Sequence, residues 1–137
     1  AGADALYVAT PGALHAEHAA AALAAGLPVL VEKPFAASAE GARRIAEAAE
    51  GAGVFCMEAM WTRFLPALAR ARAALAAGEI GTPRLLTAEF CIATAPGGSL
   101  FDPALGGGAL RQRGIYPLSL AAHLLGLPTA AEATLRR

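Results

Sequence analysis

Val29-Leu30-Val31-Glu32-Lys33-Pro34 is the stretch that decides how the rest of this chain is interpreted. Its apolar run is typical of a buried strand, and the charged pair and proline that follow mark the C-terminal end of that strand. In open α/β sheets, ligands bind in the crevice beyond the C-terminal ends of the strands. A lysine at such a point can hold a carbonyl, a phosphate or a proton, so Lys33 is a candidate functional residue.

Two similar apolar runs lie on either side of this stretch, with helix-forming segments between them. The runs at residues 6–10 and 54–57 are rich in strand formers, and residues 14–25 and 38–50 favour helix, with Ser38 as an N-cap. The order β-α-β-α-β with short loops predicts a parallel sheet with right-handed crossovers, covered on both faces. The polar strand ends are then expected along one sheet edge: Thr10-Pro11, Glu32-Lys33-Pro34 and Glu58.

The pattern changes after Glu58. A longer helix is expected over residues 64–77, a strand with one wetter face over 84–92, and a Gly/Pro-rich loop over 95–108. A helix over 109–125 is expected to be weakened or kinked near its start by Gly114 and Pro117, and the last residues to begin another strand.

The expected three-stranded sheet leaves bare hydrogen-bonding edges, and the chain opens directly on a strand. We therefore expect a fragment of α/β class. Residues 1–58 would be the second half of a Rossmann-type parallel sheet, and residues 59–137 the start of an α+β, open-sheet C-terminal domain.

Composition narrows the classes of function. Acidic and basic residues cancel to a net charge of +0, and no basic patch indicates nucleic acid or an anionic membrane. No apolar run reaches the roughly 18 residues of a transmembrane helix, and no signal peptide is visible. Cys56 and Cys91 are interpreted as free, buried thiols in a reducing compartment, which favours the cytoplasm. No GxGxxG fingerprint follows a strand, so the usual pyrophosphate cradle is absent.

Several motifs, in order and spacing, resemble the glucose–fructose oxidoreductase/inositol dehydrogenase (Gfo/Idh/MocA) family. They are Val8-Ala9-Thr10-Pro11, His15-Ala16-Glu17-His18 and Val31-Glu32-Lys33-Pro34, and the segments 57–66, 78–81 and 101–117 resemble its dihydrodiol dehydrogenase branch. The resemblance implies a Rossmann domain followed by an α+β domain. It also implies an NAD(P)-dependent dehydrogenase or reductase, of EC 1.1.1 or 1.3.1 type, that transfers a hydride between nicotinamide and a secondary alcohol or carbonyl of a sugar, cyclitol or diol.

By the same resemblance, part of the Rossmann domain and much of the C-terminal sheet lie outside this chain. An intact protein is expected to form a homo-oligomer through that sheet. NADP and NAD are both possible cofactors, because the residue that discriminates between them is not in the chain.

The resemblance also assigns residues to roles. Lys33 and Tyr116 are the expected catalytic pair, the lysine acting on the reacting oxygen and the phenol as acid or base. Gln112 and Arg63 are expected on the substrate side. The expected cofactor-binding residues are Thr10, Pro11, His15, Glu32, Lys33 and Glu58.

Two positions depart from the family pattern. Gln112 stands where an aspartate is usual and cannot accept a proton, while Gly12 stands where many relatives have asparagine. A non-catalytic relative that binds a nucleotide or a protein, or an inactive fragment, therefore remains an alternative to the enzyme. Glu58 has the equal alternative of a capping carboxylate. His15 and His18 lack a third ligand, so no metal site is expected.

Overall fold

The computed structural model describes residues 2–134, which form two compact units. The first unit contains residues 2–61 and 91–115, and the second contains residues 62–90 and 116–134. Each unit is therefore built from two stretches of chain that are distant in sequence.

A three-stranded parallel sheet forms the centre of the first unit. Its strands are β1 (Leu6–Val8), β2 (Val29–Val31) and β3 (Cys56–Glu58), hydrogen-bonded in the order β1-β2-β3. In register, Val8 lies opposite Val31, and Val31 lies opposite Glu58. All three strands therefore end along the same sheet edge, which confirms the predicted parallel arrangement and its row of strand ends.

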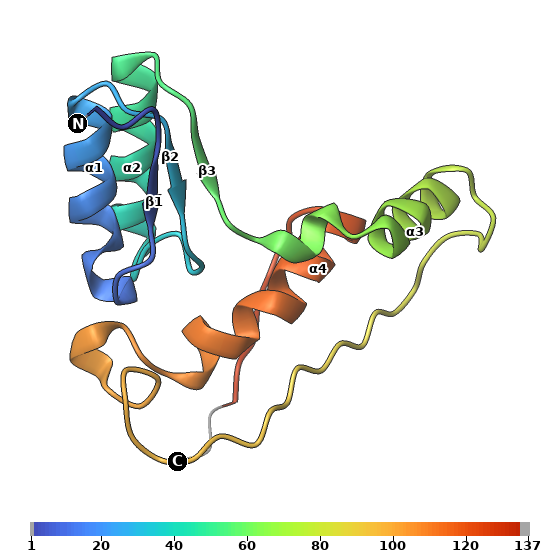
Figure 1. Ribbon diagram of the computed structural model, residues 1–137. Coiled ribbons are helices and arrows are strands. Elements are labelled where there is room, and N and C mark those ends of the chain that lie inside the picture. The colour runs from blue at the N-terminus through green and yellow to red at the C-terminus, as the bar shows by residue number, and fades with distance from the viewer. Residues whose placement is uncertain (1, 135–137) are drawn as a thin grey trace. The chain divides into compact units, whose positions relative to one another are not determined.

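Two helices, α1 (His15–Ala24) and α2 (Ala39–Ala52), pack side by side on one face of this sheet (Figure 1). The 3-10 turn η1 (Gly12–Leu14) leads into α1. Ser38 caps α2 as predicted, since its hydroxyl accepts from the Gly41 N–H at 3.1 Å. The side chains that fill the space between helices and sheet are Val8, Ala19, Ala22, Leu23, Val29, Val31 and Ile45.

The opposite face of the sheet is not covered by a helix of the described first unit. Tyr7, Leu30 and Met57 stand opposite one another in register on this face, and Tyr7 is 54% exposed. Within the first unit, only one of the two faces that were expected to be covered has its helices. The apolar character of a strand shows that it suits two covered faces, but the second cover must come from another segment.

The third strand begins later than its apolar run. Residues 54–57 were the predicted strand, but the Val54 N–H donates to the Ala49 carbonyl at the end of α2, at 3.1 Å. Gly53, with a φ of 62°, makes the turn that permits this contact. Pairing with β2 begins at the residue after Val54, where the Phe55 carbonyl accepts from the Val29 N–H at 2.9 Å, and β3 runs from Cys56 to Glu58.

Two α-helices contribute to the second unit. Helix α3 (Pro66–Ala76) follows the 3-10 turn η2 (Trp61–Phe64) and begins with Pro66 at its N-terminus, where proline is well tolerated. Helix α4 (Ile115–Leu125) follows a π-helical turn, η4 (Leu110–Gly114), which is the predicted irregularity near the start of that helix. A short 3-10 turn, η3 (Pro103–Leu105), interrupts the preceding loop. No helix within residues 2–134 is long and apolar enough to cross a membrane.

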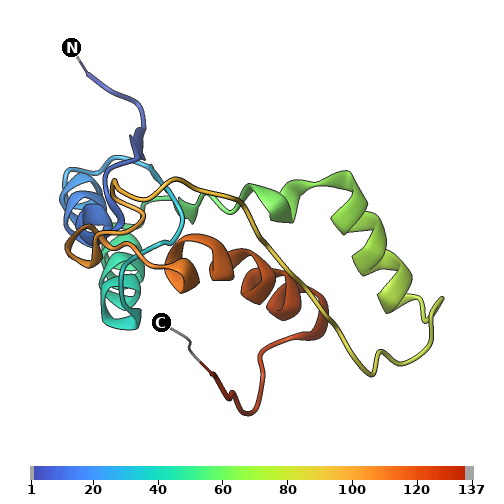
Figure 2. The same ribbon diagram turned by 90° about the horizontal axis from the view of Figure 1, so that it is seen from below.

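The predicted strand over residues 84–92 is wrong for the described chain. These residues run extended without pairing to another strand (Figure 2). A strand needs the N–H and C=O groups of a neighbour, and no described segment supplies them. Cys91 lies in this segment and is exposed, not buried as predicted. At the C-terminus, residues 129–134 form no strand, and residues 135–137 lie outside the described part.

Replacing Leu23 by alanine is expected to destabilise the first unit by about 2–5 kcal/mol, because the leucine is completely buried between helix and sheet. The matched change Leu14→Ala removes a leucine that is 37% exposed and is expected to cost much less. Urea unfolding followed by circular dichroism measures both changes. Equal losses would contradict the assignment of the core.

The two cysteines are expected to react at different rates with iodoacetamide at neutral pH. Burial raises the pKa of the Cys56 thiol, and the thiolate is the reactive form, whereas Cys91 is exposed. Peptide mapping over time is expected to find Cys91 alkylated first, and Cys91→Ser to leave only the slow reaction. Faster labelling of Cys56 would contradict its partial burial.

Candidate active site

A cavity of about 180 Å³ lies in the first unit at the C-terminal ends of β1 and β2. This is the sheet edge at which parallel α/β sheets bind ligands. The cavity is large enough for one ring-sized part of a ligand and too small for a whole dinucleotide. Its lining residues are Thr10, Pro11, Gly12, His15, Glu32, Lys33, Ser99, Leu105 and Gln112.

The segment that carries Lys33 is held at each residue. The Glu32 N–H donates to the Val8 carbonyl at 2.9 Å, and the Lys33 N–H donates to the Glu32 carboxylate at 2.9 Å. The Phe35 N–H donates to the Glu58 carboxylate at 2.8 Å. The Lys33–Pro34 peptide bond is cis. Lys33 therefore stands on a fixed strand end and not on a loose loop.

The Glu32 carboxylate has a second partner on β1. Its other oxygen accepts from the Tyr7 hydroxyl at 2.5 Å. This hydrogen bond, followed by burial and the negative charge of Glu32, raises the pKa of the Tyr7 phenol. Both oxygens of the carboxylate thus take part in contacts that stabilise the ends of β1 and β2.

The ammonium of Lys33 reaches across the cavity to Gln112. It donates to the Gln112 backbone carbonyl at 3.2 Å and to the side-chain oxygen at 3.4 Å. The Gln112 amide nitrogen in turn donates to the Gly106 carbonyl at 3.2 Å. Lys33 is the only lysine in the sequence, and its charge lies beside a neutral amide where related sequences were expected to place a carboxylate.

His15 forms the buried wall of the cavity. Its Nδ1 lies 2.8 Å from the Pro34 carbonyl oxygen, and its Nε2 lies 2.8 Å from the Thr10 carbonyl oxygen. The residue is 1% exposed. Both ring nitrogens are thus engaged by backbone, whereas the His18 ring contacts only the Thr10 hydroxyl, at 3.1 Å.

Sequence reasoning missed the loop that closes the cavity with Ser99 and Leu105. Two glycines allow it to pack closely. At Gly106, with a φ of 83°, an added Cβ would lie 2.8 Å from the Ala13 nitrogen, and at Gly107 one would lie 2.5–2.8 Å from three carbonyl oxygens. The run Gly106-Gly107-Gly108 was the available signal, because adjacent glycines are typical of close backbone approach.

The other two predicted site residues belong to the second unit. The Tyr116 ring stacks on Phe90, with centroids 4.4 Å apart and an interplanar angle of 20°. Arg63 donates its Nε–H to the Ser119 hydroxyl at 3.0 Å. The predicted pairing of Tyr116 with Lys33 therefore stays a prediction.

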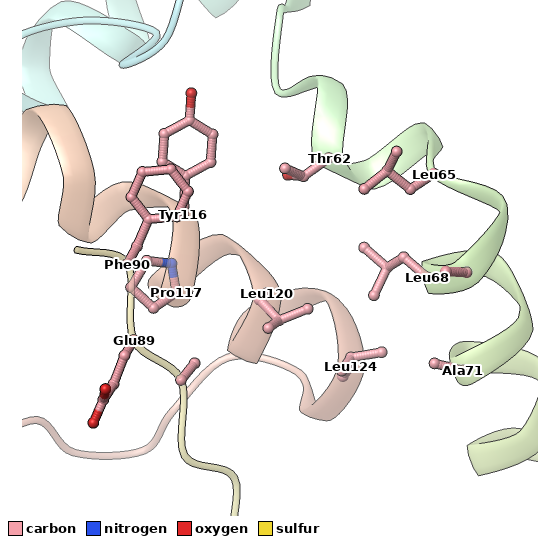
Figure 3. A pocket seen from close by; sticks show the side chains of 12 residues that line it. Thr62, Leu65, Leu68, Ala71, Glu89, Phe90, Tyr116, Pro117, Leu120 and Leu124 are labelled. Carbon is pink, nitrogen blue, oxygen red and sulfur yellow. The ribbon is translucent and has the colours of Figure 1, made fainter. Parts of the chain in front are cut away.

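An apolar groove of about 440 Å³ lies beside Tyr116 in the second unit. Leu65, just before α3, and Leu68 of α3 point toward Leu120 and Leu124 of α4 (Figure 3). The Tyr116 hydroxyl points away from these leucines. The tyrosine thus offers its ring to apolar neighbours and leaves its polar end outside the groove.

Six of the predicted site residues are brought together in one cavity, and three are not. Glu58 acts in this structure as a capping carboxylate for the segment after Lys33, and Arg63 and Tyr116 belong to the other unit. Within residues 2–134, no three His, Cys, Asp or Glu side chains are grouped so as to hold a metal ion. The six that share the cavity are Thr10, Pro11, His15, Glu32, Lys33 and Gln112.

A parallel sheet with a lysine and a polar cavity at its C-terminal edge defines a Rossmann-type ligand-binding fold. Comparison with protein families also indicates a Rossmann-type fold. Residues 1–60 match the oxidoreductase family with an NAD-binding Rossmann fold, and residues 68–137 match the GFO/IDH/MocA C-terminal domain. The chain belongs to the Gfo/Idh/MocA family of oxidoreductases, as the sequence motifs indicated.

Named relatives include dehydrogenases of sugars and diols. The chain is 39% identical over 126 residues to D-xylose 1-dehydrogenase (NADP(+)) of Hypocrea jecorina, covering 85% of this chain and 32% of that protein. It is 39% identical over 122 residues to human trans-1,2-dihydrobenzene-1,2-diol dehydrogenase, covering 87% of this chain and 36% of that protein.

Among solved structures, a 3-ketoreductase from Actinomadura kijaniata in complex with NADP and TDP-benzene superimposes with a TM-score of 0.82 at 37% identity. The match covers 90% of this chain and 38% of that one. The chain thus spans about a third of the length of these relatives.

Changing Gln112 is expected to alter the reactivity of Lys33 toward acetic anhydride. Gln112→Glu places a carboxylate beside the ammonium and favours the unreactive charged form, whereas Gln112→Met, of similar size, removes the polar side-chain contact. Lys33 is expected to acylate about tenfold more slowly in the glutamate variant than in the methionine variant. Mass spectrometry measures this, with the α-amino group as internal reference, and equal rates would contradict the contact.

Proposed function

We propose that the complete protein carrying this chain is an NAD(P)-dependent oxidoreductase. Its reaction is hydride transfer between nicotinamide and a secondary alcohol or carbonyl of a sugar, cyclitol or diol. The observation that carries the proposal is the Lys33 ammonium, fixed at the end of β2 in a polar cavity. Family membership and the names of the relatives support the same reaction class.

The residues around the cavity fit one end of the cofactor. Thr10 and Pro11 present backbone at the end of β1, and Lys33 supplies a cationic donor, a set that suits the ribose and carboxamide of a nicotinamide nucleoside. His15, Glu32 and Glu58 act on the cofactor side by holding these segments in place. The described chain contains no glycine-rich loop after a strand for the pyrophosphate, so only this end of the cofactor is assigned here.

The cofactor supplies the redox chemistry, and the protein supplies orientation and proton handling. Lys33 donates a hydrogen bond to the substrate oxygen and stabilises negative charge that develops on it. Tyr116 exchanges the hydroxyl proton as acid or base. Gln112 and Arg63 bind substrate hydroxyls through their amide and guanidinium groups.

The proposal also covers the cofactor, the cellular compartment and the oligomeric state of the complete protein. NADP is supported over NAD by the xylose dehydrogenase name and by the NADP complex of the structural neighbour. Two free cysteines support a cytoplasmic protein. The complete protein forms a homo-oligomer through its C-terminal sheet. Its domain boundary lies between residues 58 and 59.

Lys33→Ala in the complete protein is expected to lower kcat by about 10²–10³-fold, the usual cost of removing one charge-stabilising donor. Fluorescence titration is expected to show NADPH still bound. Arg43→Ala is the matched control, since it removes an exposed cation from α2 and is expected to leave kcat unchanged. Near-normal turnover in Lys33→Ala would overturn the assignment. NADPH binding without turnover by the parent protein, across a panel of sugars and diols, would favour the non-catalytic alternative.

A further inference from the structure

His15 makes an unusual pair of contacts for a buried histidine. Its two ring nitrogens each lie 2.8 Å from a backbone carbonyl oxygen, one of Thr10 and one of Pro34. A carbonyl oxygen only accepts hydrogen bonds, so the ring must donate at each nitrogen that bonds. The imidazole therefore links the end of β1 to the segment that follows β2.

These contacts act on the residue next to Lys33. Glu32 is held by β1 through its N–H, and Phe35 is held by β3 through Glu58. Pro34 lacks an N–H, so its carbonyl is the only backbone group that can fasten it by a hydrogen bond. The His15 ring contacts that carbonyl through Nδ1, at 2.8 Å.

We infer that His15 is a positioning residue, and that its Nδ1 hydrogen bond to the Pro34 carbonyl fixes Lys33 in the cavity. The inference rests on the proposed catalytic role of Lys33. It assigns His15 an action through the protein backbone, because both ring nitrogens are engaged and the side chain is 1% exposed. Direct contact of a ring nitrogen with a cofactor would displace one of these two carbonyl oxygens.

Two substitutions separate the two contacts. In His15→Asn, the amide nitrogen can occupy the position of Nδ1 and keep the donor to Pro34. In His15→Gln, the amide nitrogen can occupy the position of Nε2 and keep the donor to Thr10, while the Pro34 carbonyl loses its partner. Both variants are polar and carry no charge, so they differ mainly in which carbonyl they reach.

The expected results follow from this difference. In the complete protein, His15→Asn is expected to keep kcat close to that of the parent. His15→Gln is expected to lower kcat by about 10- to 100-fold, as misplacement of a catalytic group by about 1 Å can do. KM and the NADPH dissociation constant are expected to change little in either variant. His123→Asn, the same kind of exchange on α4, is the matched control and is expected to leave kcat unchanged.

A readout independent of turnover separates this inference from the proposed function. In the chain itself, the rate of Lys33 acylation by acetic anhydride is expected to change in His15→Gln and to match the parent in His15→Asn. Equal effects of the two variants on that rate, or none in His15→Gln, would overturn the inference even if Lys33 is catalytic. Normal turnover in Lys33→Ala would overturn the proposed function instead. If His15→Gln does not fold, loss of the parent rate in His15→Asn overturns the inference, and its retention supports it.

Discussion

The backbone ladder of the three parallel strands is the constraint on which the rest of the first unit depends. It places Val8, Val31 and Glu58 side by side, and it continues past the strands through the Glu32 N–H to Val8 and the Ala59 N–H to Val31. Because the strands run in one direction, everything that follows them emerges at one edge. The cavity, the segment around Lys33 and the Glu58 contact all follow from this alignment.

Local structure could be predicted from the sequence wherever a short-range rule decides it. The Ser38 cap and the helix disturbed near Gly114 are of this kind. Structure that depends on distant partners could not be predicted. Residues 84–92 have the alternation of a strand, yet pairing requires a neighbour that no pattern within those residues specifies. The open sheet face around Tyr7 has the same cause.

The candidate site shows the same division. Lys33 could be identified from local sequence alone, because a residue that follows a buried strand lies at the sheet edge where ligands bind. Its contact with Gln112 crosses 79 positions of sequence and depends on how the glycine loop folds back, so only the family resemblance pointed to that residue. His15 was expected beside the cofactor. Its contacts with two carbonyls could not be foreseen, since backbone acceptors leave no mark in the sequence.

The crowding at Gly107 limits how this site can diversify. Three carbonyl oxygens occupy the place where a side chain would begin, so the loop that carries Ser99 and Leu105 must keep a glycine at this point. Changes that reshape this side of the cavity fall on the lining residues of the loop and its continuation, namely Ser99, Leu105 and Gln112. Selection or design for a new ligand at this end of the fold therefore works with a small set of adjustable positions on an invariant frame.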